Sequence, residues 1–217
     1  MQIVPISFQF LDPFTADDGI RMLKKIERIA RVSHRSEDRV TEDSYDKFLR
    51  SVVMTHGDLS VIEHVNVTVE VEVDRGITHE IVRHRIGAYT QESTRFVNYN
   101  KQPMRFIQPP FKSAMTDSFW EEAVEHLEET YLALLKEGEP PEIARSVLPN
   151  SLAAKLVITY NLRMWRYFLI MRTTKEAHPQ MKLLTIPLVD RFKETIPILF
   201  EDILPEVRQA DAMRLLR

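Results

Sequence analysis

The residues best suited to chemistry lie in one short stretch, Arg83 to Arg95, which reads RHRIGAYTQESTR. It holds three arginines, one histidine, one glycine and four hydroxyl side chains in thirteen positions. Guanidinium groups carry a fixed charge and fork onto phosphates and carboxylates, so clustered arginines repel one another unless an anion binds among them. The stretch is typical of a binding loop, and it predicts a phosphorylated small molecule as ligand. A solvated basic loop that only makes surface salt bridges is the alternative.

Three further arginines stand among apolar residues. They are Arg145, ahead of a Leu-Pro pair, Arg163, two residues after Asn161, and Arg172. Each has a plain structural explanation: Arg163 can extend along an apolar surface, and Arg172 can favour the end of a helix. Together with the Arg83–Arg95 stretch they indicate anionic ligands, because charges in apolar surroundings need partners.

Helical geometry limits what Arg163 and Arg172 can do together. They are nine positions apart, which at about 3.6 residues per turn places them on nearly opposite faces of one helix. They would therefore serve different ligands or sites shared between subunits. We favour the second interpretation, which predicts a homo-oligomer.

The elements that position these residues are predicted from periodicity and turn residues. Residues 65–73 alternate valine with polar residues, which predicts a strand with one buried face and an antiparallel sheet. Further strands are predicted at 2–10 and 96–107. Helices are predicted at 17–32, 44–54, 77–84, 118–136, 141–147, 151–172 and 179–200, the last kinked or divided at Pro187 and Pro197. The predicted fold class is α+β, with flanking helices, a helical C-terminal half and a single domain over residues 1–217.

Composition excludes several classes of site. The chain has no cysteine, which rules out disulfides, thiolate zinc sites, iron–sulfur clusters and a cysteine nucleophile. Its five glycines fit neither a G-x-G-x-x-G nor a Walker motif. A net charge of −3 disfavours a general nucleic-acid binder. Without a long apolar run or a leader-like N-terminus, we expect a cytoplasmic protein.

The sequence disfavours both a metal site and a nucleophilic serine. His79 and His84 are five positions apart and His56 and His64 eight apart, so neither pair has the spacing of a helical zinc site, and no metal is expected. Ser93 lacks the G-x-S-x-G context of a nucleophilic serine, and its arginine neighbours suit phosphate binding better than acyl transfer.

The pattern Arg83-His84-Arg85, seven residues, then Ser93 resembles the R-H-R-x7-S motif of the flavin-dependent thymidylate synthases. Further similar segments occur in the family's order between about residues 20 and 200. They are Ala30–Ser33, Glu63-His64, Ala144-Arg145 through Leu148-Pro149, Asn161–Arg163, Arg172 and Ala177–Pro179. The resemblance implies a fold of the thymidylate synthase-complementing protein type.

The resemblance also implies an activity: FAD-dependent conversion of dUMP to dTMP, with methylenetetrahydrofolate as carbon donor and NADPH as reductant. It implies a homotetramer whose active sites lie between subunits. Residues implied to bind FAD are Ser60, Arg83, His84, Arg85, Gln91, Asn161, Arg163 and Tyr167. Residues implied to bind dUMP are Glu80, Arg83, Gln91, Ser93, Thr94, Arg95, Arg145 and Arg172. Glu80 and Tyr167 stand where the family often has glutamine and asparagine.

Arg172 is the implied catalytic residue. A chain without cysteine cannot activate the uracil ring by thiolate attack, as the other class of thymidylate synthase does. A fixed guanidinium beside N3 and O2 would instead stabilise negative charge on the ring, and redox work would fall to the flavin. Two other interpretations stay open: a non-catalytic nucleotide- or RNA-binding protein that uses the same arginines, and an inactive relative that keeps the fold.

Overall fold

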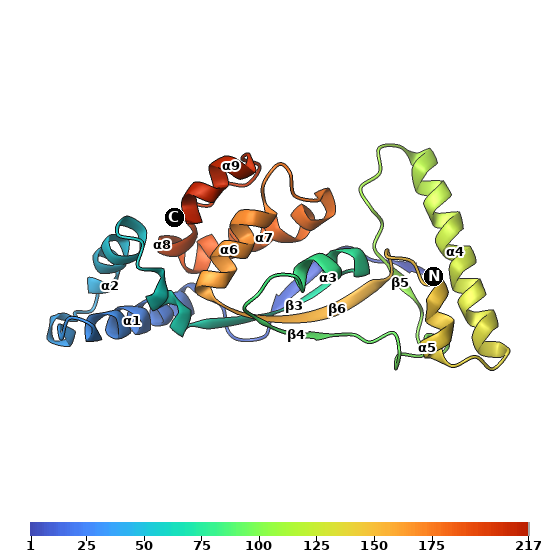
Figure 1. Ribbon diagram of the computed structural model, residues 1–217, viewed down its shortest axis with the longest axis horizontal. Helices are drawn as coiled ribbons and strands as arrows, with labels where there is room; N and C mark the ends of the chain where they lie inside the picture. The colour runs from blue at the N-terminus through green and yellow to red at the C-terminus, as the bar shows by residue number, and fades with distance from the viewer. Residues whose placement is uncertain (217) are drawn as a thin grey trace. The chain divides into compact units, whose positions relative to one another are not determined.

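Two long neighbouring strands, each continuing directly into a helix, organise the fold. In the computed structural model, which describes residues 1–216, these are β3 (Asn66–Asp74) followed by α3 (Arg75–Ile81), and β6 (Ala153–Asn161) followed by α6 (Leu162–Arg172) (Figure 1). Asp74 and Asn161 are the N-caps, and each is extended, with φ of −72° in both. An extended cap residue whose side chain accepts a helix N–H lets a strand turn into a helix within one position.

The other elements are shorter or flank these two. The strands are β1 (Gln2–Ile3), β2 (Ser7–Phe10), β4 (Ala88–Gln91) and β5 (Arg105–Phe106). The helices are α1 (Ala16–Val32), α2 (Ser44–Leu49), α4 (Ala114–Lys136), α5 (Pro141–Ala144), α7 (Pro179–Thr195), α8 (Pro197–Phe200) and α9 (Gln209–Ala212). A π-helical turn follows α2 at Arg50–Thr55, and 3-10 turns occupy Glu37–Arg39, Leu59–His64, Arg145–Val147 and Met213–Leu216.

The main sheet has the order β2-β3-β6-β4. Its neighbours run antiparallel: the N–H of Leu162 donates to Val65 at one end of the β3–β6 pair, and the N–H of Arg75 donates to Leu152 at the other. Beside it, β1 and β5 form a parallel two-stranded sheet, with Gln2 opposite Arg105. The predicted α+β class with an antiparallel sheet is therefore confirmed.

Several predicted elements are confirmed and others are wrong. The valine strand occupies 66–74, and the valines at positions 67 to 73 are buried. The helices predicted at 17–32, 44–54, 118–136 and 141–147 are present with small shifts, and Pro197 does separate α7 from α8. The helix predicted at 77–84 lies at 75–81, and the strand predicted at 2–10 is two short strands. Of the strand predicted at 96–107, only Arg105–Phe106 is extended in a sheet.

The prediction of one helix over 151–172 is wrong in its first half, because 153–161 is strand β6. Its burial alternates along the chain, and the β-branched run Val157–Thr159 fits a pleated surface better than a helix. The interpretation of the whole Arg83–Arg95 stretch as a loop is also wrong, since Ala88–Gln91 is strand β4 at the edge of the sheet.

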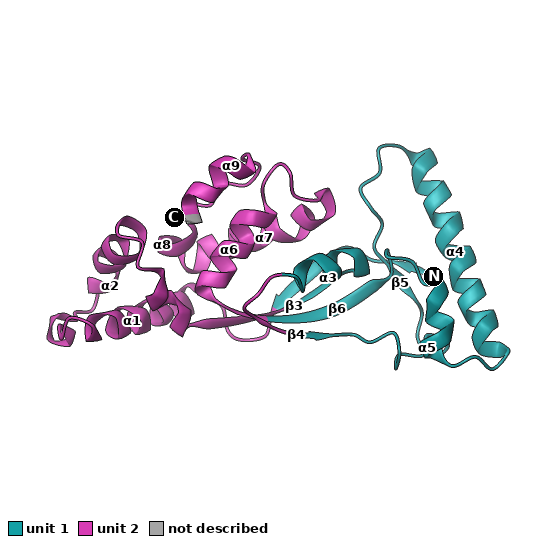
Figure 2. Ribbon diagram, viewed as in Figure 1, with its two compact units in different colours: residues 1–9, 70–83, 89–158 teal, residues 10–69, 84–88, 159–217 magenta. Residues whose placement is uncertain are grey.

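The chain forms two compact units that interleave in sequence (Figure 2). Unit 1 contains residues 1–9, 70–83 and 89–158, and unit 2 contains 10–69, 84–88 and 159–217. The core of unit 1 consists of Tyr99, Met104, Phe106, Val124, Tyr131, Ala144 and Leu152. The core of unit 2 includes an aromatic group of Phe10, Phe14, Tyr160, Trp165, Phe168, Phe192 and Phe200.

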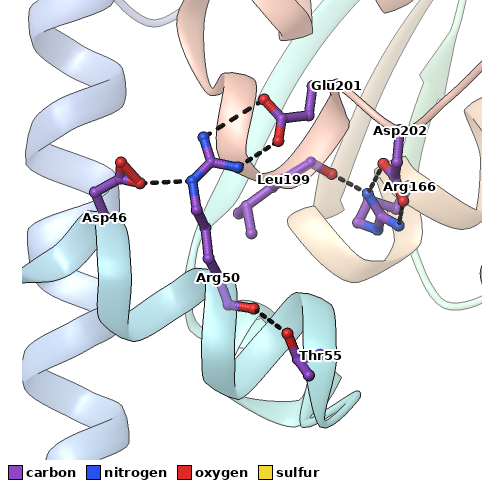
Figure 3. Close-up of polar contacts among 7 residues, drawn as sticks. All are labelled: Asp46, Arg50, Thr55, Arg166, Leu199, Glu201 and Asp202. Carbon is purple, nitrogen blue, oxygen red and sulfur yellow. Dashed lines mark hydrogen bonds and ion pairs between the residues drawn. The ribbon is translucent and has the colours of Figure 1, made fainter.

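Within unit 2, α6 is anchored by a buried arginine. Arg166 is 4% exposed, and its two Nη atoms each lie 2.8 Å from a carboxylate oxygen of Asp202, while Nη1 also donates to the carbonyl of Leu199 (Figure 3). Next to it, Arg50 joins Asp46 and Glu201. The turn after α8 is thus held by two arginines from two different elements, and Arg166 fixes this turn against α6.

None of the helices found in residues 1–216 is long and apolar enough to span a membrane.

Candidate functional site

Helix α6 carries three of the predicted site residues and is fixed at its first turn by Asn161. The Oδ1 atom of Asn161 accepts the N–H of Met164 at 2.8 Å and caps the helix. The indole N–H of Trp165 donates to the carbonyl of Val67 at 3.0 Å, which ties the same turn to β3. The helix therefore has a defined position relative to the strand beside it, and its side chains are held accordingly.

Arg172, at the last position of α6, makes a direct contact with His84. Its Nε donates to Nε2 of His84 at 2.7 Å. The imidazole lies edge-on to Phe168 at a centroid distance of 5.0 Å and to Tyr167 at 5.9 Å. His84 is 9% exposed, so it is buried against these aromatic rings at the point where it meets the guanidinium.

The environment keeps His84 neutral. Burial lowers the pKa of His84 from 6.5 to about 4, and the adjacent positive charge of Arg172 acts in the same direction. A neutral imidazole can accept a hydrogen bond at Nε2 only when its proton is on Nδ1. The contact therefore selects one tautomer of His84 and orients the plane of the Arg172 guanidinium.

A pocket of about 270 Å³ in unit 2 gathers four of the residues predicted for FAD. These are Arg85, Asn161, Arg163 and Tyr167, which come from the arginine stretch and from the start of α6. The same pocket is lined by Glu63, Ile86 and Met164, which were not predicted as site residues. Ile86 is 83% exposed and Tyr167 41%, so the pocket offers apolar surface beside its two arginines.

Arg163 has an acidic partner in this pocket, Glu63. Its Nη1 donates to the carboxylate of Glu63 at 2.6 Å, and both side chains are about half exposed. An exposed pair of this kind is weak, at about 0–1 kcal/mol, so an incoming anion can compete for the guanidinium. Glu63 follows Ser60 by three positions in the 3-10 turn. The sequence feature that could have identified Glu63 as a site residue is its place in the Glu63-His64 segment.

A second pocket, of about 460 Å³, lies in unit 1. It is lined by Arg75, Thr94, Glu142, Arg145, Ser146 and Leu148. Thr94 and Arg145 were predicted to bind dUMP, and Nη1 of Arg145 donates to Oγ1 of Thr94 at 3.3 Å. Arg95, also predicted, has its Nη2 3.6 Å from the Glu142 carboxylate. The fold thus joins Thr94 and Arg145, which are 51 positions apart in sequence, by one hydrogen bond.

The remaining predicted residues lie outside these two pockets. Ser93 Oγ accepts the N–H of Arg95 at 3.3 Å, and Gln91 donates to the buried hydroxyl of Thr78 at 3.0 Å. Arg83 and Ser60 are exposed, and Glu80 is partly buried near the end of α3. Of the arginine stretch, Arg83 and residues 89–95 belong to unit 1, whereas residues 84–88 belong to unit 2.

Gly87 is required by close packing in the arginine stretch. A Cβ atom at this position would lie 2.2 Å from Cε1 of the buried Tyr160, closer than real side chains approach. Glycine therefore lets the chain pass directly over the end of β6 between Arg85 and β4.

Among residues 1–216, no group of three or more histidine, aspartate or glutamate side chains is arranged to hold a metal ion.

Comparison with known proteins gives consistent matches. The sequence model of the family described as "Thymidylate synthase complementing protein" matches residues 20–198. The chain is 31% identical over 170 residues to the flavin-dependent thymidylate synthase of Sulfurisphaera tokodaii, covering 78% of this chain and 66% of that protein. It is 32% identical over 166 residues to the enzyme of the same name from Saccharolobus solfataricus, covering 76% and 64%. The chain thus spans slightly less than two thirds of the length of these relatives.

Among solved structures, the fold is similar to that of the UMP/dUMP methylase PolB from Streptomyces cacaoi, crystallised with 5-Br dUMP. The TM-score is 0.75 at 23% sequence identity, and the match covers 93% of this chain and 96% of that one. This likeness supports the fold described above.

Proposed function

The chain belongs to the family of thymidylate synthase complementing proteins, and on that premise we propose that it is an FAD-dependent enzyme that methylates dUMP to dTMP. The observation that carries the proposal is the pocket of unit 2, which brings Arg85, Asn161, Arg163 and Tyr167 together from separate segments. These are half of the residues that the resemblance implies for FAD. The relatives that share about a third of the sequence are named flavin-dependent thymidylate synthases.

The residues of this pocket fit part of a flavin dinucleotide. Arg85 and Arg163 suit its phosphates, and Ile86, Met164 and Tyr167 give apolar surface for a ring. The amide nitrogen of Asn161 has no hydrogen-bond partner within residues 1–216, because only its Oδ1 is used as a helix cap. Pockets for drug-sized ligands measure about 300–1,000 Å³. A pocket of about 270 Å³ therefore holds one portion of FAD, and other residues must bind the rest.

The pocket of unit 1 fits the phosphate of a nucleotide. Arg145 is held there by the hydroxyl of Thr94, and Arg95 stands at its edge through Glu142. Guanidinium and hydroxyl groups are the usual side-chain ligands of phosphate. Ser93 acts in this proposal as a binding residue, since its hydroxyl already accepts the N–H of Arg95.

Arg172 is proposed to stabilise negative charge on the uracil ring. A preorganised cation is most effective where charge develops and where it need not reorient. The hydrogen bond from Nε to His84 supplies that orientation. Bound FAD would supply the redox chemistry, so that two electrons from NADPH would reduce the methylene carbon of methylenetetrahydrofolate to a methyl group. Since NADPH supplies both electrons, the folate leaves as tetrahydrofolate and the electron count balances.

The proposal includes a single catalytic domain. We propose that this domain assembles as a homotetramer with active sites between its subunits. Arg163 and Arg172 both lie on α6, nine positions apart, and they face different partners, Glu63 and His84. A pocket too small for the whole cofactor also favours a site completed by another copy of the chain.

The absorption spectrum of the purified full chain tests the proposal. After addition of FAD and removal of the excess, the protein should be yellow and should bleach with NADPH under anaerobic conditions. It should form dTMP from dUMP only when folate donor, FAD and NADPH are all present, and UMP should be assayed in parallel because the structural neighbour is named for both nucleotides. A protein that neither retains FAD nor forms dTMP would overturn the proposal. Strongly salt-dependent oligonucleotide binding in that case would favour the RNA-binding alternative.

A further inference from the structure

Gln91, which the resemblance implies as a ligand-binding residue, is anchored by a buried hydroxyl that no sequence motif singled out. Its Nε2 donates to Oγ1 of Thr78 at 3.0 Å, across 13 positions of sequence. Thr78 lies in α3 and is 0% exposed, and Gln91 is the last residue of the edge strand β4. Both residues belong to unit 1. The hydrogen bond therefore connects α3 with the strand that leads to Ser93.

The hydroxyl of Thr78 has one proton, and the helix already uses it. Oγ1 of Thr78 donates to the carbonyl of Arg75 at 2.9 Å, a contact between residues three positions apart that threonines often make inside helices. A hydroxyl has one donor site and two acceptor sites, so Oγ1 can meet Gln91 only as an acceptor. The amide of Gln91 must therefore turn an N–H, and not its oxygen, towards Thr78.

A flipped amide would lose one of these two hydrogen bonds. With Oε1 of Gln91 turned towards Thr78, the hydroxyl would have to leave the carbonyl of Arg75 in order to donate to the amide. One intramolecular hydrogen bond corresponds to about a two- to twelvefold change in an equilibrium constant. The observed orientation is favoured by about that factor, and the burial of Thr78 keeps water from replacing the missing partner.

The oxygen of the Gln91 amide is left for a ligand. Among residues 1–216, Oε1 of Gln91 makes no hydrogen bond, and the side chain is only partly buried. An amide oxygen accepts from O–H and N–H groups, so a fully ionised phosphate, which has neither, cannot use it. The groups of dUMP that can donate are the sugar hydroxyl and the N3–H of uracil.

We propose that Thr78 is a positioning residue that fixes the Gln91 amide with its oxygen towards bound dUMP, so that Gln91 recognises the nucleotide as a hydrogen-bond acceptor. The donor is the sugar hydroxyl or the N3–H of the nucleotide. The identity of the nucleotide rests on the proposed function, whereas the orientation of the amide in the free protein does not. Thr78 is fully buried, so it acts through Gln91 and does not touch the ligand.

The orientation is measured first in the full-length protein without nucleotide, by NMR of selectively ¹⁵N-labelled glutamine side chains. Gln91→Ala assigns the Gln91 signal. The variant Thr78→Val keeps the shape of threonine but lacks the hydroxyl. The Nε2 proton held by Thr78 should exchange with water about two- to twelvefold more slowly in the wild type than the same proton in Thr78→Val. Equal exchange in both proteins would overturn the inference.

Calorimetric titration of the FAD-loaded protein with dUMP then measures the effect on binding. Thr78→Val should weaken dUMP binding about three- to tenfold, because an unanchored glutamine samples both amide orientations and more rotamers. Thr78→Ser keeps the hydroxyl and should bind dUMP within about twofold of the wild type. Thr130→Val is the matched control, since it removes a hydroxyl that donates to the carbonyl of His126 in α4 of the same unit. Its dUMP affinity should be unchanged.

A double-mutant cycle separates positioning from a structural effect. If Thr78 acts through Gln91, Thr78→Val should change nothing further once Gln91→Ala has removed the amide. Equal losses of dUMP affinity with and without the amide would make Thr78 a structural residue and overturn the inference. If Thr78→Val does not fold, as judged by circular dichroism, Thr78→Ala removes the same hydroxyl and adds no group in its place.

Two analogues of dUMP identify the donor. 2′,3′-Dideoxyuridine monophosphate lacks the sugar hydroxyl, and N3-methyl-dUMP lacks the N3–H. The analogue without the donor should bind equally to the wild type and to Thr78→Val, because the contact with Oε1 no longer exists in either protein. A Thr78→Val loss of the same size for dUMP and for both analogues would overturn the acceptor role of Gln91.

Failure of the proposed enzymatic function is a separate outcome. A wild-type protein that does not bind dUMP would refute the nucleotide contact together with the proposed function, while slow exchange of the Gln91 amide would still uphold its orientation by Thr78. A protein that shows the predicted dUMP binding but forms no dTMP would uphold this inference and refute the enzyme.

Discussion

Arg172 and His84, 88 positions apart in sequence, form a hydrogen bond of 2.7 Å in which Nε of the arginine donates to Nε2 of the histidine. The first residue belongs to the end of α6 and the second to the arginine stretch. The contact makes His84 a positioning residue for Arg172, because only the neutral imidazole with its proton on Nδ1 can accept this bond. The role predicted for His84, contact with FAD, is compatible with this geometry but is not needed to explain its burial.

Replacing His84 should affect catalysis through the orientation of Arg172. His84→Gln places an amide oxygen near the former Nε2 and should retain most of kcat, whereas His84→Ala should lower kcat at least about tenfold with a smaller change in the KM for dUMP. Steady-state dTMP formation measures both. Equal activity of the alanine and glutamine variants would show that the hydrogen bond has no catalytic role.

Stability should depend on pH through His84. Its pKa is about 4 in the folded protein, against 6.5 ordinarily, so the unfolded chain binds more protons between these values. The free energy of unfolding should therefore fall as the pH is lowered from about 6.5 to about 4, and be fully retained above that range. Urea denaturation from pH 4 to 7 measures this, and His84→Gln should remove this part of the dependence. Parallel curves for both proteins would contradict the shift.

Arg172→Ala should abolish dTMP formation while the bound flavin is still reduced by NADPH. Arg172→Lys keeps the charge but loses the Nε donor to His84, and we expect kcat to fall by about 100-fold or more. Anaerobic bleaching at the flavin absorption band is measured beside product formation. Loss of both activities together would assign Arg172 to flavin binding or to structure instead.

Glu142 lines the unit 1 pocket in which we propose that the nucleotide phosphate binds, and its carboxylate lies 3.6 Å from Arg95, so it would compete with an incoming anion. Glu142→Gln should strengthen dUMP binding about two- to fivefold at low salt, which corresponds to an exposed ion pair of up to about 1 kcal/mol. The gain should shrink as ionic strength rises. Glu139→Gln, an exposed carboxylate of the same unit outside the pocket, is the control. Weaker binding in Glu142→Gln would mean that Glu142 instead holds Arg95 in a binding-competent position.

Two neighbouring carboxylates in Figure 3 should differ in their effect on stability. Asp202→Asn leaves the buried charge of Arg166 without its counter-ion and should cost about 2–3 kcal/mol, less than a fully buried pair because Asp202 is partly exposed. Glu201→Gln removes the exposed pair with Arg50 and should cost less than about 1 kcal/mol. Chemical denaturation compares the two, and similar losses would show that burial of Arg166 is not the deciding factor.

Much of the fold was predictable because its signals are local. The alternating valines of β3 and the helically spaced apolar residues of α1 indicate directly which face of each element is buried. The change from strand to helix at Asn161 is not marked by a glycine or a proline. Because residues on both sides of it also occur commonly in helices, the sequence alone did not indicate the boundary. The N-cap chemistry of Asn161 was the missed signal, and the same chemistry at Asp74 marks the start of α3.

The candidate site was predictable only in part, for a different reason. Arg145, Arg163 and Arg172 stand out because arginine is unusual among apolar neighbours. Arg75 and Glu142 look like ordinary surface residues, and only the pairing of distant segments brings them to one pocket. Whether a guanidinium has a counter-ion is a tertiary property, and spacing along the chain does not contain it.

The interleaving of the two units has a consequence for how the protein forms during synthesis. The chain passes from one unit to the other after residues 9, 69, 83, 88 and 158. A nascent chain that has reached β4 contains pieces of both units, and unit 2 still lacks residues 160–200, which supply five of the seven aromatic side chains named for its core. The first part of unit 2 must therefore keep its apolar surface exposed on the ribosome until the last quarter of the chain emerges. Truncation after residue 83 or after residue 88 would leave two incomplete cores, and such fragments are expected to aggregate or be degraded.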